Sequence, residues 1–380
     1  MKTKLFFSTA FIVMLVLPVQ NFAQAPTLGT AANFVLFTSV GAVTNVGPSY
    51  LTGNVGSNSG SSTGFGNVDG NMLNNNGATA LCASDLLIAY NQLNSTVAGF
   101  FPASPLGNGA TLTAGVYSLS GNSILNNTLT LDGQGNPNAV FIFLINGTFA
   151  SNTNAVVQLT NTAQACNVFW KIEGAVGLST GTSMKGTIIA NNAAISISSS
   201  VTLEGRALST TGAISVNNVL AYIPLGCSAP ILNGPAAPAL ATTACYAIFS
   251  SNGAVSNVGV TTVTGDIGSN NGLTTNYNSL LVNGTIHPIP DLSTAQCSVD
   301  LGNVYTYLNT LTADIILLYP AQFGNNLVLT PHTYLMNGAV TLTDSLYLNA
   351  QGNANAVFVI QVNGAFSTSV NSKIILINGT

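Results

Sequence analysis

The chain has 380 residues, of which only 4% are charged and 47% are hydrophobic, and its formal net charge is −4. Because lysine and arginine are so scarce, there is no basic stripe for phosphates, which argues against nucleic acid as a partner. The many apolar residues favour packed cores over a disordered polymer, and the length is sufficient for two domains.

Residues 1–25 have the pattern of a secretory signal peptide. Lys2 and Lys4 precede an uncharged apolar run, and residues 23–25 have the small-x-small pattern that signal peptidase accepts. A membrane anchor is the alternative, but the apolar run is too short to span a bilayer comfortably. We therefore expect an extracellular protein, secreted or at the cell surface, with no membrane insertion of the mature chain.

One sequence unit occurs twice. FTSVGAVTNVG at 37–47 recurs as FSSNGAVSNVG at 249–259, and LDGQGNPNAVFIFLING from Leu131 recurs as LNAQGNANAVFVIQVNG from Leu348. The offset between the copies grows only from 212 to 217 residues, so small loop insertions separate them. The first copy continues after Ala163, whereas the second stops at the equivalent residue, so we expect the second copy to be incomplete at its C-terminal end.

A single amphipathic helix is predicted in each copy. In the first, residues 83–97 place Leu86, Tyr90 and Leu93 at spacings of three and four, with Ser84 as the N-cap. Residues 298–311 match them in the second copy. A helix this isolated must bury its apolar side, so we expect it to buttress a wall of strands.

A shorter repeat of 19 residues runs from 167 to 218. Strict alternation of apolar and polar residues within it is typical of strands with one buried face. The predicted buried columns are Val176, Ile195 and Ile214; Leu178, Ile197 and Val216; and Met184 and Leu203. A fixed period near twenty predicts a β-solenoid, because each rung can bury its apolar face only against its neighbours. A sandwich of hairpins, the alternative, would not keep this register.

Four prolines and many alanines between 224 and 243 predict an extended spacer. The expected organisation is therefore a signal peptide at 1–25, a first domain at 26–223, a linker at 224–243 and a second domain at 244–380.

Five cysteines are present in this exported chain, so disulfides are expected. Cys82 and Cys297 occupy equivalent positions, and the counterpart of Cys166 would fall at 383. We predict a bridge between Cys82 and Cys166, with Cys297 lacking its partner. Cys227 and Cys245 flank the linker, and the sequence leaves their pairing open. There is no CxxC motif, so no metal site is expected.

Several motifs together resemble the bacterial and fungal ice-binding protein family. They are GNVGSN at 53–58, the single helix, NAVFIFLING at 138–147, and the 19-residue rungs ending in GRALSTTGAI at 205–214. The resemblance implies a mainly β, right-handed discontinuous β-solenoid with one helix along its side in each of two tandem domains. It also implies adsorption to ice through one flat sheet face, giving antifreeze, recrystallisation-inhibiting or ice-adhesion activity.

Outward positions beside the buried columns provide the candidate ice-binding face. Rungs of a sheet lie about 4.8 Å apart and alternate side chains about 7 Å apart, so small uncharged groups there form a regular lattice. The candidates are Gly177, Ser196 and Ser215; three residues on, Thr180, Ser199 and Asn218; and Thr44 and Thr52 from the opening segment. The charged Lys185, Glu204 and Arg206 are predicted to lie on a different edge.

Two other classes of function occur among exported proteins of this kind. Exported β-solenoids include polysaccharide-cleaving enzymes, but the ten carboxylates form no evident pair and the first copy contains no histidine, so we predict a non-enzyme without cofactors. The other class is a non-catalytic cell-surface adhesin or glycan-binding module of the same fold. Trp170, the only tryptophan, shares a predicted column with Ile189 and Leu208, which favours packing over a sugar platform. A monomer is expected.

Overall fold

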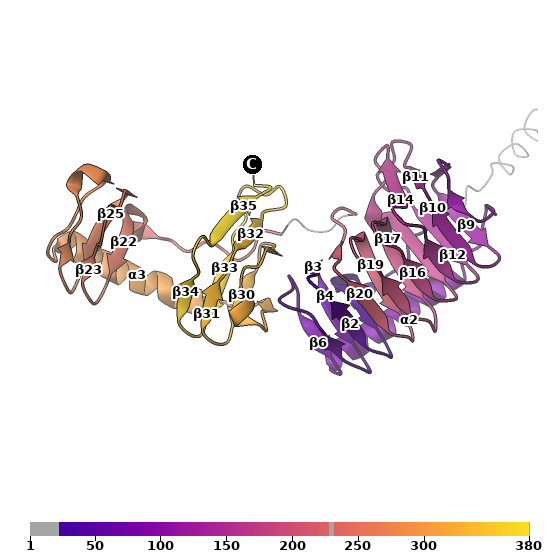
Figure 1. Ribbon diagram of the computed structural model, residues 1–380, viewed down its shortest axis with the longest axis horizontal. Helices are drawn as coiled ribbons and strands as arrows, with labels where there is room; N and C mark the ends of the chain where they lie inside the picture. Colours follow the sequence, from indigo (N-terminus) through magenta and orange to yellow (C-terminus); the bar gives the residue numbers. More distant parts are fainter. Residues whose placement is uncertain (1–22, 228–231, 380) are drawn as a thin grey trace, which may run out of the picture. The chain divides into compact units, whose positions relative to one another are not determined.

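The computed structural model describes residues 23–227 and 232–379 (Figure 1). They form two compact units, one ending at residue 230 and the other beginning at residue 231. All strand pairs in the two described ranges are parallel, so consecutive strands coil forward instead of folding back as hairpins. The β-solenoid prediction is confirmed, and the hairpin sandwich is excluded.

The first unit has three sides. One is a separate sheet of eight parallel strands, which we call the eight-strand sheet. In spatial order it contains β5 (Ser62–Thr63), β2 (Val43–Val46), β20 (Ile214–Asn217), β18 (Ile195–Ile197), β16 (Val176–Leu178), β13 (Phe149–Ser151), β10 (Ser123–Asn126) and β7 (Leu106–Gly107).

The other two sides share the long strands β17 (Ser183–Ala190) and β19 (Thr202–Ser209). Their second halves belong to the helix side, and their first halves belong to the side that we call the charged side. The helix side also contains β6 (Met72–Asn74), β4 (Asn54–Ser57), β1 (Phe34–Thr38), β15 (Val168–Ile172), β12 (Phe141–Ile145) and β9 (Gly115–Leu119). The charged side also contains β3 (Tyr50–Thr52), β21 (Leu220–Tyr222), β14 (Val156–Thr160), β11 (Thr128–Asp132) and β8 (Thr111–Thr113).

The corner within β17 requires glycine. Gly186 has φ +101°, and a Cβ there would lie 2.5 Å from the carbonyl oxygen of Val168. No L side chain fits such a position without moving the backbone. Gly205 stands opposite Gly186 in β19, so both long strands turn the corner at the same height.

The opening strands are inserted beside the closing strands, which makes the solenoid discontinuous. Leu36 of β1 lies opposite Ala207 of β19, Thr44 of β2 lies opposite Ser215 of β20, and β3 pairs with β21. The first unit is therefore completed only when both ends of its sequence meet.

The predicted buried columns are present. Val176, Ile195 and Ile214 are directly paired, and each is at most 2% exposed. The column predicted for Trp170 is wrong by one residue, because Trp170 lies opposite Ile188 instead of Ile189. The turn Asn191–Ala194 is one residue longer than its counterpart in the preceding rung, which shifts the register on the helix side.

Trp170 is nevertheless a core residue. It is fully buried, its indole Nε1 donates to the Lys185 carbonyl at 2.9 Å, and its ring stacks on Phe143 with a centroid distance of 4.0 Å. Phe143 stacks in turn on Tyr117, at 5.3 Å. These rings occupy equivalent positions in three successive rungs, so they form an aromatic ladder inside the solenoid.

Helix α2 (Gly77–Asn94) begins six residues earlier than predicted. Asn76, not Ser84, is the N-cap: its side chain accepts from the Thr79 backbone N–H, and the Thr79 hydroxyl accepts from the Asn76 backbone N–H. The buried residues of the helix are Thr79, Cys82, Leu86, Ala89 and Leu93. They pack on the outer surface of the helix side, which confirms the buttress.

The second unit repeats this design with fewer strands. Helix α3 (Leu292–Thr310) begins after Asp291, which forms the same reciprocal cap with Thr294. Before it come the pairs β22 (Tyr246–Ser250) with β25 (Asp266–Ser269), β23 (Val255–Ser256) with β26 (Thr274–Thr275), and β24 (Val263–Thr264) with β27 (Val282–Asn283). After it come β28 (Ile315–Ile316), β30 (Thr333–Met336) and β33 (Val359–Val362); β29 (Leu327–Leu329), β32 (Ser345–Asn349) and β35 (Lys373–Ile377); and β31 (Val340–Leu342) and β34 (Phe366–Thr368).

The two groups of strands in the second unit do not pair with each other in the described ranges. In the first unit, β15–β21 lie between the equivalent groups. Phe366 is 51% exposed, whereas its equivalent Phe149 is 1% exposed. The second unit therefore presents side chains to solvent that the first unit buries.

The predicted bridge between Cys82 and Cys166 is wrong. Cys166 is bonded to Cys227, with their Cα atoms 6.0 Å apart. Cys82 lies on the buried face of α2, whereas Cys166 lies in the short 3-10 helix η2 (Ala165–Asn167), where Gln164 Oε1 accepts from the Cys227 backbone N–H at 2.9 Å. Reasoning from the duplicated positions failed here because the bridge joins η2 to the end of the unit, not to the helix.

The segment expected to be a spacer makes contacts near both of its ends. Pro224 is buried and Cys227 is bridged within the first unit. Further on, the Asn233 carbonyl accepts from the Val357 backbone N–H at 2.9 Å, and the 3-10 helix η3 begins at Ala241. Most of the predicted signal peptide, up to residue 22, lies outside the described residues.

Candidate functional site

One row of side chains crosses the outer surface of the eight-strand sheet. We call it the central ladder, and its members lie directly opposite one another on successive strands. In spatial order they are Thr63, Thr44, Ser215, Ser196, Gly177, Ala150 and Ile124. Every member except Ile124 is small, and none is charged. A Cβ built on Gly177 would meet nothing within 4 Å, so this position opens directly to solvent.

Two further rows flank the central ladder. Alternate residues of an extended chain share a face, so the residue two places before each member of the central ladder also points outward. These earlier residues include Ala175, Ala194 and Ala213, all exposed. The residues two places after the members of the central ladder carry mainly amides and hydroxyls, among them Ser198, Asn217 and Asn152. The eight strands contain no charged residue.

Hydrogen bonds link neighbouring members of these rows. Ser215 Oγ donates to Ser196 Oγ at 3.2 Å, and Asn152 Nδ2 donates to Asn126 Oδ1 at 2.8 Å. Such bonds restrict side-chain rotation. The polar groups of the face are therefore held at the spacing of the strands, about 4.8 Å.

The structure brings together four of the eight predicted site residues. Thr44, Ser215, Ser196 and Gly177 are consecutive members of the central ladder. The sequence argument missed Thr63, Ala150 and the outer rows. The alternation itself would have identified Ala175, Ala194 and Ala213, since each stands one residue before a buried Val or Ile.

Thr180, Ser199 and Asn218 lie at the margin of this face, not on its strands. They follow the ends of β16, β18 and β20 in turns, and Asn218 has φ +50°. Their backbones are ordered by hydrogen bonds between rungs, such as that from the Ser200 N–H to the Asn218 carbonyl at 2.9 Å. They form a corner beside the candidate face.

Thr52 lies on a different side from Thr44. It belongs to β3 on the charged side, opposite Tyr222, and the next residue in that row is Glu204. The chain turns between β2 and β3 at Gly47, whose φ is +75°. Thr52 is therefore not part of the candidate face.

Charged groups of the first unit lie on the other two sides. Lys185 Nζ contacts Glu204 Oε2 at 2.7 Å on the charged side. Arg206, only 6% exposed, donates from Nε to the Ala32 carbonyl at 2.9 Å on the helix side. Burial lowers the pKa of Arg206 to about 10. The candidate face is thus the side without ionic groups.

Helix α2 and a polar network close the helix side. Lys171 Nζ donates to Asn94 Oδ1 at 2.8 Å and forms an ion pair with Glu173, while Tyr90 donates to Glu173 at 2.9 Å. Burial, together with the Glu173 carboxylate, raises the pKa of Tyr90 to about 12. Burial also disfavours ionised Glu173, but hydrogen bonds from Lys171, Asn191 and Tyr90 outweigh it and lower the pKa of this carboxyl.

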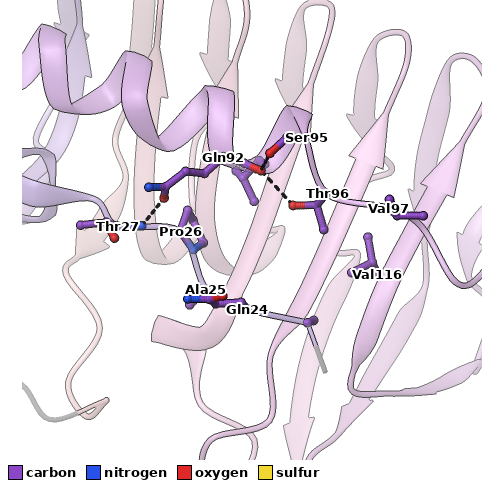
Figure 2. A pocket seen from close by; sticks show the side chains of 11 residues that line it. Gln24, Ala25, Pro26, Thr27, Gln92, Ser95, Thr96, Val97 and Val116 are labelled. Atoms are coloured by element: carbon purple, nitrogen blue, oxygen red, sulfur yellow. Dashed lines mark hydrogen bonds between the residues drawn. The ribbon is translucent and has the colours of Figure 1, made fainter. Parts of the chain in front are cut away.

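A pocket lies where residues 23–27 pass the end of α2, and Figure 2 shows its lining. The Thr27 backbone N–H donates to Gln92 Oε1 at 2.7 Å, and Val116 forms part of the wall. None of its lining side chains titrates, so it offers no acid or base for catalysis. In the described part of the chain, no three His, Cys, Asp or Glu residues are grouped to hold a metal ion.

The second unit has a shorter version of the same face. Ser256 lies opposite Thr275, and Thr341 lies opposite Ser367 with their hydroxyl oxygens 2.9 Å apart. By the sequence duplication, Ser256 corresponds to Thr44 of the central ladder. Thr275 corresponds to Thr63 in the same way, whereas Thr341 and Ser367 stand where the first unit has Ile124 and Ala150. All four of these positions in the second unit therefore carry hydroxyl groups.

Comparison with known proteins agrees with this architecture. The model of the ice-binding-like family matches residues 37–220 and 249–380, which is most of the chain. The chain belongs to the ice-binding-like family. Its two matched segments coincide with the two units, and the likeness expected from the sequence motifs is confirmed.

Individual family members are similar over different lengths. An ice-binding protein of Nostoc sp. (strain HG1) is 42% identical over 173 residues, and the match covers 44% of this chain and 63% of that relative. The crystal structure of an ice-binding protein from an Antarctic Flavobacteriaceae bacterium is 60% identical, with a TM-score of 0.91 and coverage of 94% of this chain and 84% of that one. That of the Antarctic ascomycete Antarctomyces psychrotrophicus is 28% identical, with a TM-score of 0.51, and covers 53% and 98%.

Proposed function

We propose that this protein binds ice through the eight-strand sheet, with the central ladder and its flanking rows as the contact surface. The observation that supports this most directly is the outward lattice of small uncharged side chains, from Thr63 to Ala150, on the side without charge. Membership of the ice-binding-like family supports ice as the ligand, and the geometry of this chain supports the eight-strand sheet as the contact surface.

Small side chains suit a surface that must order water. Each pairs at most one polar group with a methyl or methylene group, so a bound water is held without disturbing its neighbours. A charged group would hold its own hydration shell and break the pattern. The rigid rungs fix the spacing, so little conformational entropy is lost when the lattice meets a crystal.

The test is a bulky substitution in the middle of the central ladder. Ser196→Tyr should strongly reduce thermal hysteresis and incorporation into growing ice, because the ring lifts neighbouring rungs away from the crystal. Gln158→Tyr is the matched control: Gln158 is exposed and points outward from β14 on the charged side. It should retain wild-type activity, and both variants should melt like the wild type.

Three results would refute the choice of face. Wild-type hysteresis in the Ser196→Tyr variant would show that the central ladder does not meet ice. Equal loss in both variants would show that the charged side contributes as much. Loss in the Gln158→Tyr variant alone would reassign the site.

The remaining aspects follow from the same proposal. The protein acts by adsorption, without catalysis, cofactor or nucleic-acid partner, and as an extracellular monomer that is free or attached to the cell surface. Residues 1–25 would direct export, and 26–223 and 244–380 would be the two ice-binding-like domains, joined by 224–243. No helix in the described ranges is long and apolar enough to cross a membrane.

The adhesin alternative receives little support from the side chains. A glycan platform uses exposed aromatic rings, but Trp170 is fully buried in the aromatic ladder. The central ladder contains no aromatic residue. Ice-affinity partitioning of the full chain separates the two functions, since an adhesin would be excluded from growing ice.

A further inference from the structure

Each unit contains the same anchoring contact, which joins the segment before its first strand to its own helix. In the first unit, the Thr30 backbone N–H and hydroxyl both donate to Asp85 Oδ2 at 2.7 Å. In the second, the Thr242 N–H and hydroxyl both donate to Asp300 Oδ2, the former at 3.1 Å. These residues are equivalent in the sequence duplication, so both segments meet their helices in the same way.

Cys297 lies on the face of α3 that meets this segment. Ser293, Cys297 and Asp300 are spaced by four and three residues, so they share one face of the helix. The residues on either side of the cysteine both contact the segment: Asp300 accepts from Thr242, and the Ser293 hydroxyl is 2.7 Å from the Tyr246 hydroxyl.

Cys245 lies in the segment between those two contacts. It is the last residue of η3, three residues after Thr242 and immediately before Tyr246. Both cysteines therefore lie between the same two hydrogen-bonded contacts, Cys245 on the segment and Cys297 on the helix. Asp300 and a Cys245 thiolate both lie close enough to Cys297 to add to the effect of burial, which raises the pKa of Cys297 to about 11.

The pair is particular to the second unit. Cys82 occupies the position of Cys297 in α2, but Asn33 occupies the position of Cys245. Neither Cys245 nor Cys297 takes part in the bridge between Cys166 and Cys227. Only the second unit therefore has a cysteine in the segment as well as one on the helix, although the contacts around the two positions are equivalent.

We propose that Cys245 and Cys297 form a second disulfide in an oxidising compartment, which fastens the segment ahead of β22 to helix α3. The oxidant is a disulfide, either small or part of an oxidoreductase. Cys245 is exposed, so its thiolate attacks one sulfur of the oxidant and releases the other as a thiolate. The buried Cys297 then loses its proton to water or to the released thiolate and attacks the Cys245 sulfur. Two thiols become one disulfide, and the oxidant leaves as two thiols.

The test uses the full chain and oxidised glutathione. The chain has three free cysteines in addition to its bridge, so titration of the denatured protein should find three thiols before oxidation and one afterwards. Non-reducing digestion should give one peptide that joins residues 245 and 297, lighter by two hydrogens than its separated halves. Cys245→Ser and Cys297→Ser should each abolish that peptide.

Two further variants test the geometry. Cys82→Ala should leave formation of the new bridge unchanged, because Cys82 belongs to the other unit. Asn33→Cys should create a bridge to Cys82 under the same conditions, because Thr30 and Asp85 make the same hydrogen bonds as Thr242 and Asp300 do in the second unit.

Four outcomes would overturn the proposal. They are three thiols after oxidation, a stable glutathione adduct at Cys245, a linked peptide that joins Cys245 to any cysteine other than Cys297, and failure of the Asn33→Cys variant to bridge. Oxidation should also raise the temperature at which the second unit melts, and this rise should be absent from the Cys245→Ser variant.

Discussion

Removal of the bridge between Cys166 and Cys227 should destabilise the first unit substantially. The bridge closes a loop with a sequence separation of 61 residues. In the chain-entropy model such a loop contributes about 4 kcal/mol to the free energy of unfolding at 25 °C. For a unit of roughly 200 residues, that loss lowers the melting temperature by about 8–16 °C.

The assay follows tryptophan fluorescence during heating, with and without a reductant. Trp170 is the only tryptophan and is buried in the first unit, so its emission reports the unfolding of that unit alone. Cys82→Ala is the control, and its melting temperature should remain sensitive to the reductant. The reasoning is refuted if the reductant does not change the melting temperature of the wild type. Loss of that sensitivity in the Cys82→Ala variant would restore the bridge expected from the sequence.

Three other predictions concern core packing, a charged side chain and unpaired strand edges. Trp170→Ala should cost about 3–5 kcal/mol in calorimetric unfolding, whereas Trp170→Phe keeps an aromatic ring and should cost about 1 kcal/mol through its lost hydrogen bond; equal costs would contradict the aromatic ladder. The pKa of Glu173 is lowered in the folded state, so its stabilisation is complete above the usual carboxyl pKa and is lost as the pH falls through the folded value. Glu173→Gln should therefore weaken the dependence of the urea midpoint on pH between about pH 5 and pH 3, and an unchanged dependence would count against the network. Isolated residues 232–379 should unfold less cooperatively in urea than residues 23–227, because their strand edges lack partners; equally sharp transitions would refute this.

The sequence predicted the solenoid because its repeat is direct evidence of register. A 19-residue period with strict alternation placed Val176, Ile195 and Ile214 in one column, as the structure has them. The period could not reveal Trp170's true neighbour, since one extra residue in a turn shifts one side of the coil and not the others. The helix start was predicted six residues too late because the reciprocal Asn76–Thr79 cap lies well ahead of Leu86, where the apolar spacing begins.

The candidate face was predicted in part. Alternation identifies which residues point outward within a strand, and this placed Gly177, Ser196 and Ser215 correctly in one row. It does not say where a strand ends, so residues three places on were assigned to the sheet although they turn the corner. Thr52 was misplaced for a related reason: spacing along the chain carries no information on which of three sides a short strand joins.

The position of β1 against β19 has a consequence for how the molecule is made. Leu36 and its neighbour Ala207 are separated by nearly the whole first unit, so this pairing has a large contact order, which slows folding. Ribosomal synthesis delivers the opening strands long before the strands beside which they will lie. The opening strands therefore keep unpaired edges until β19 has been synthesised and can pair with β1. A disruptive substitution near Ser209 would then impair the folding of β1 as severely as that of β19.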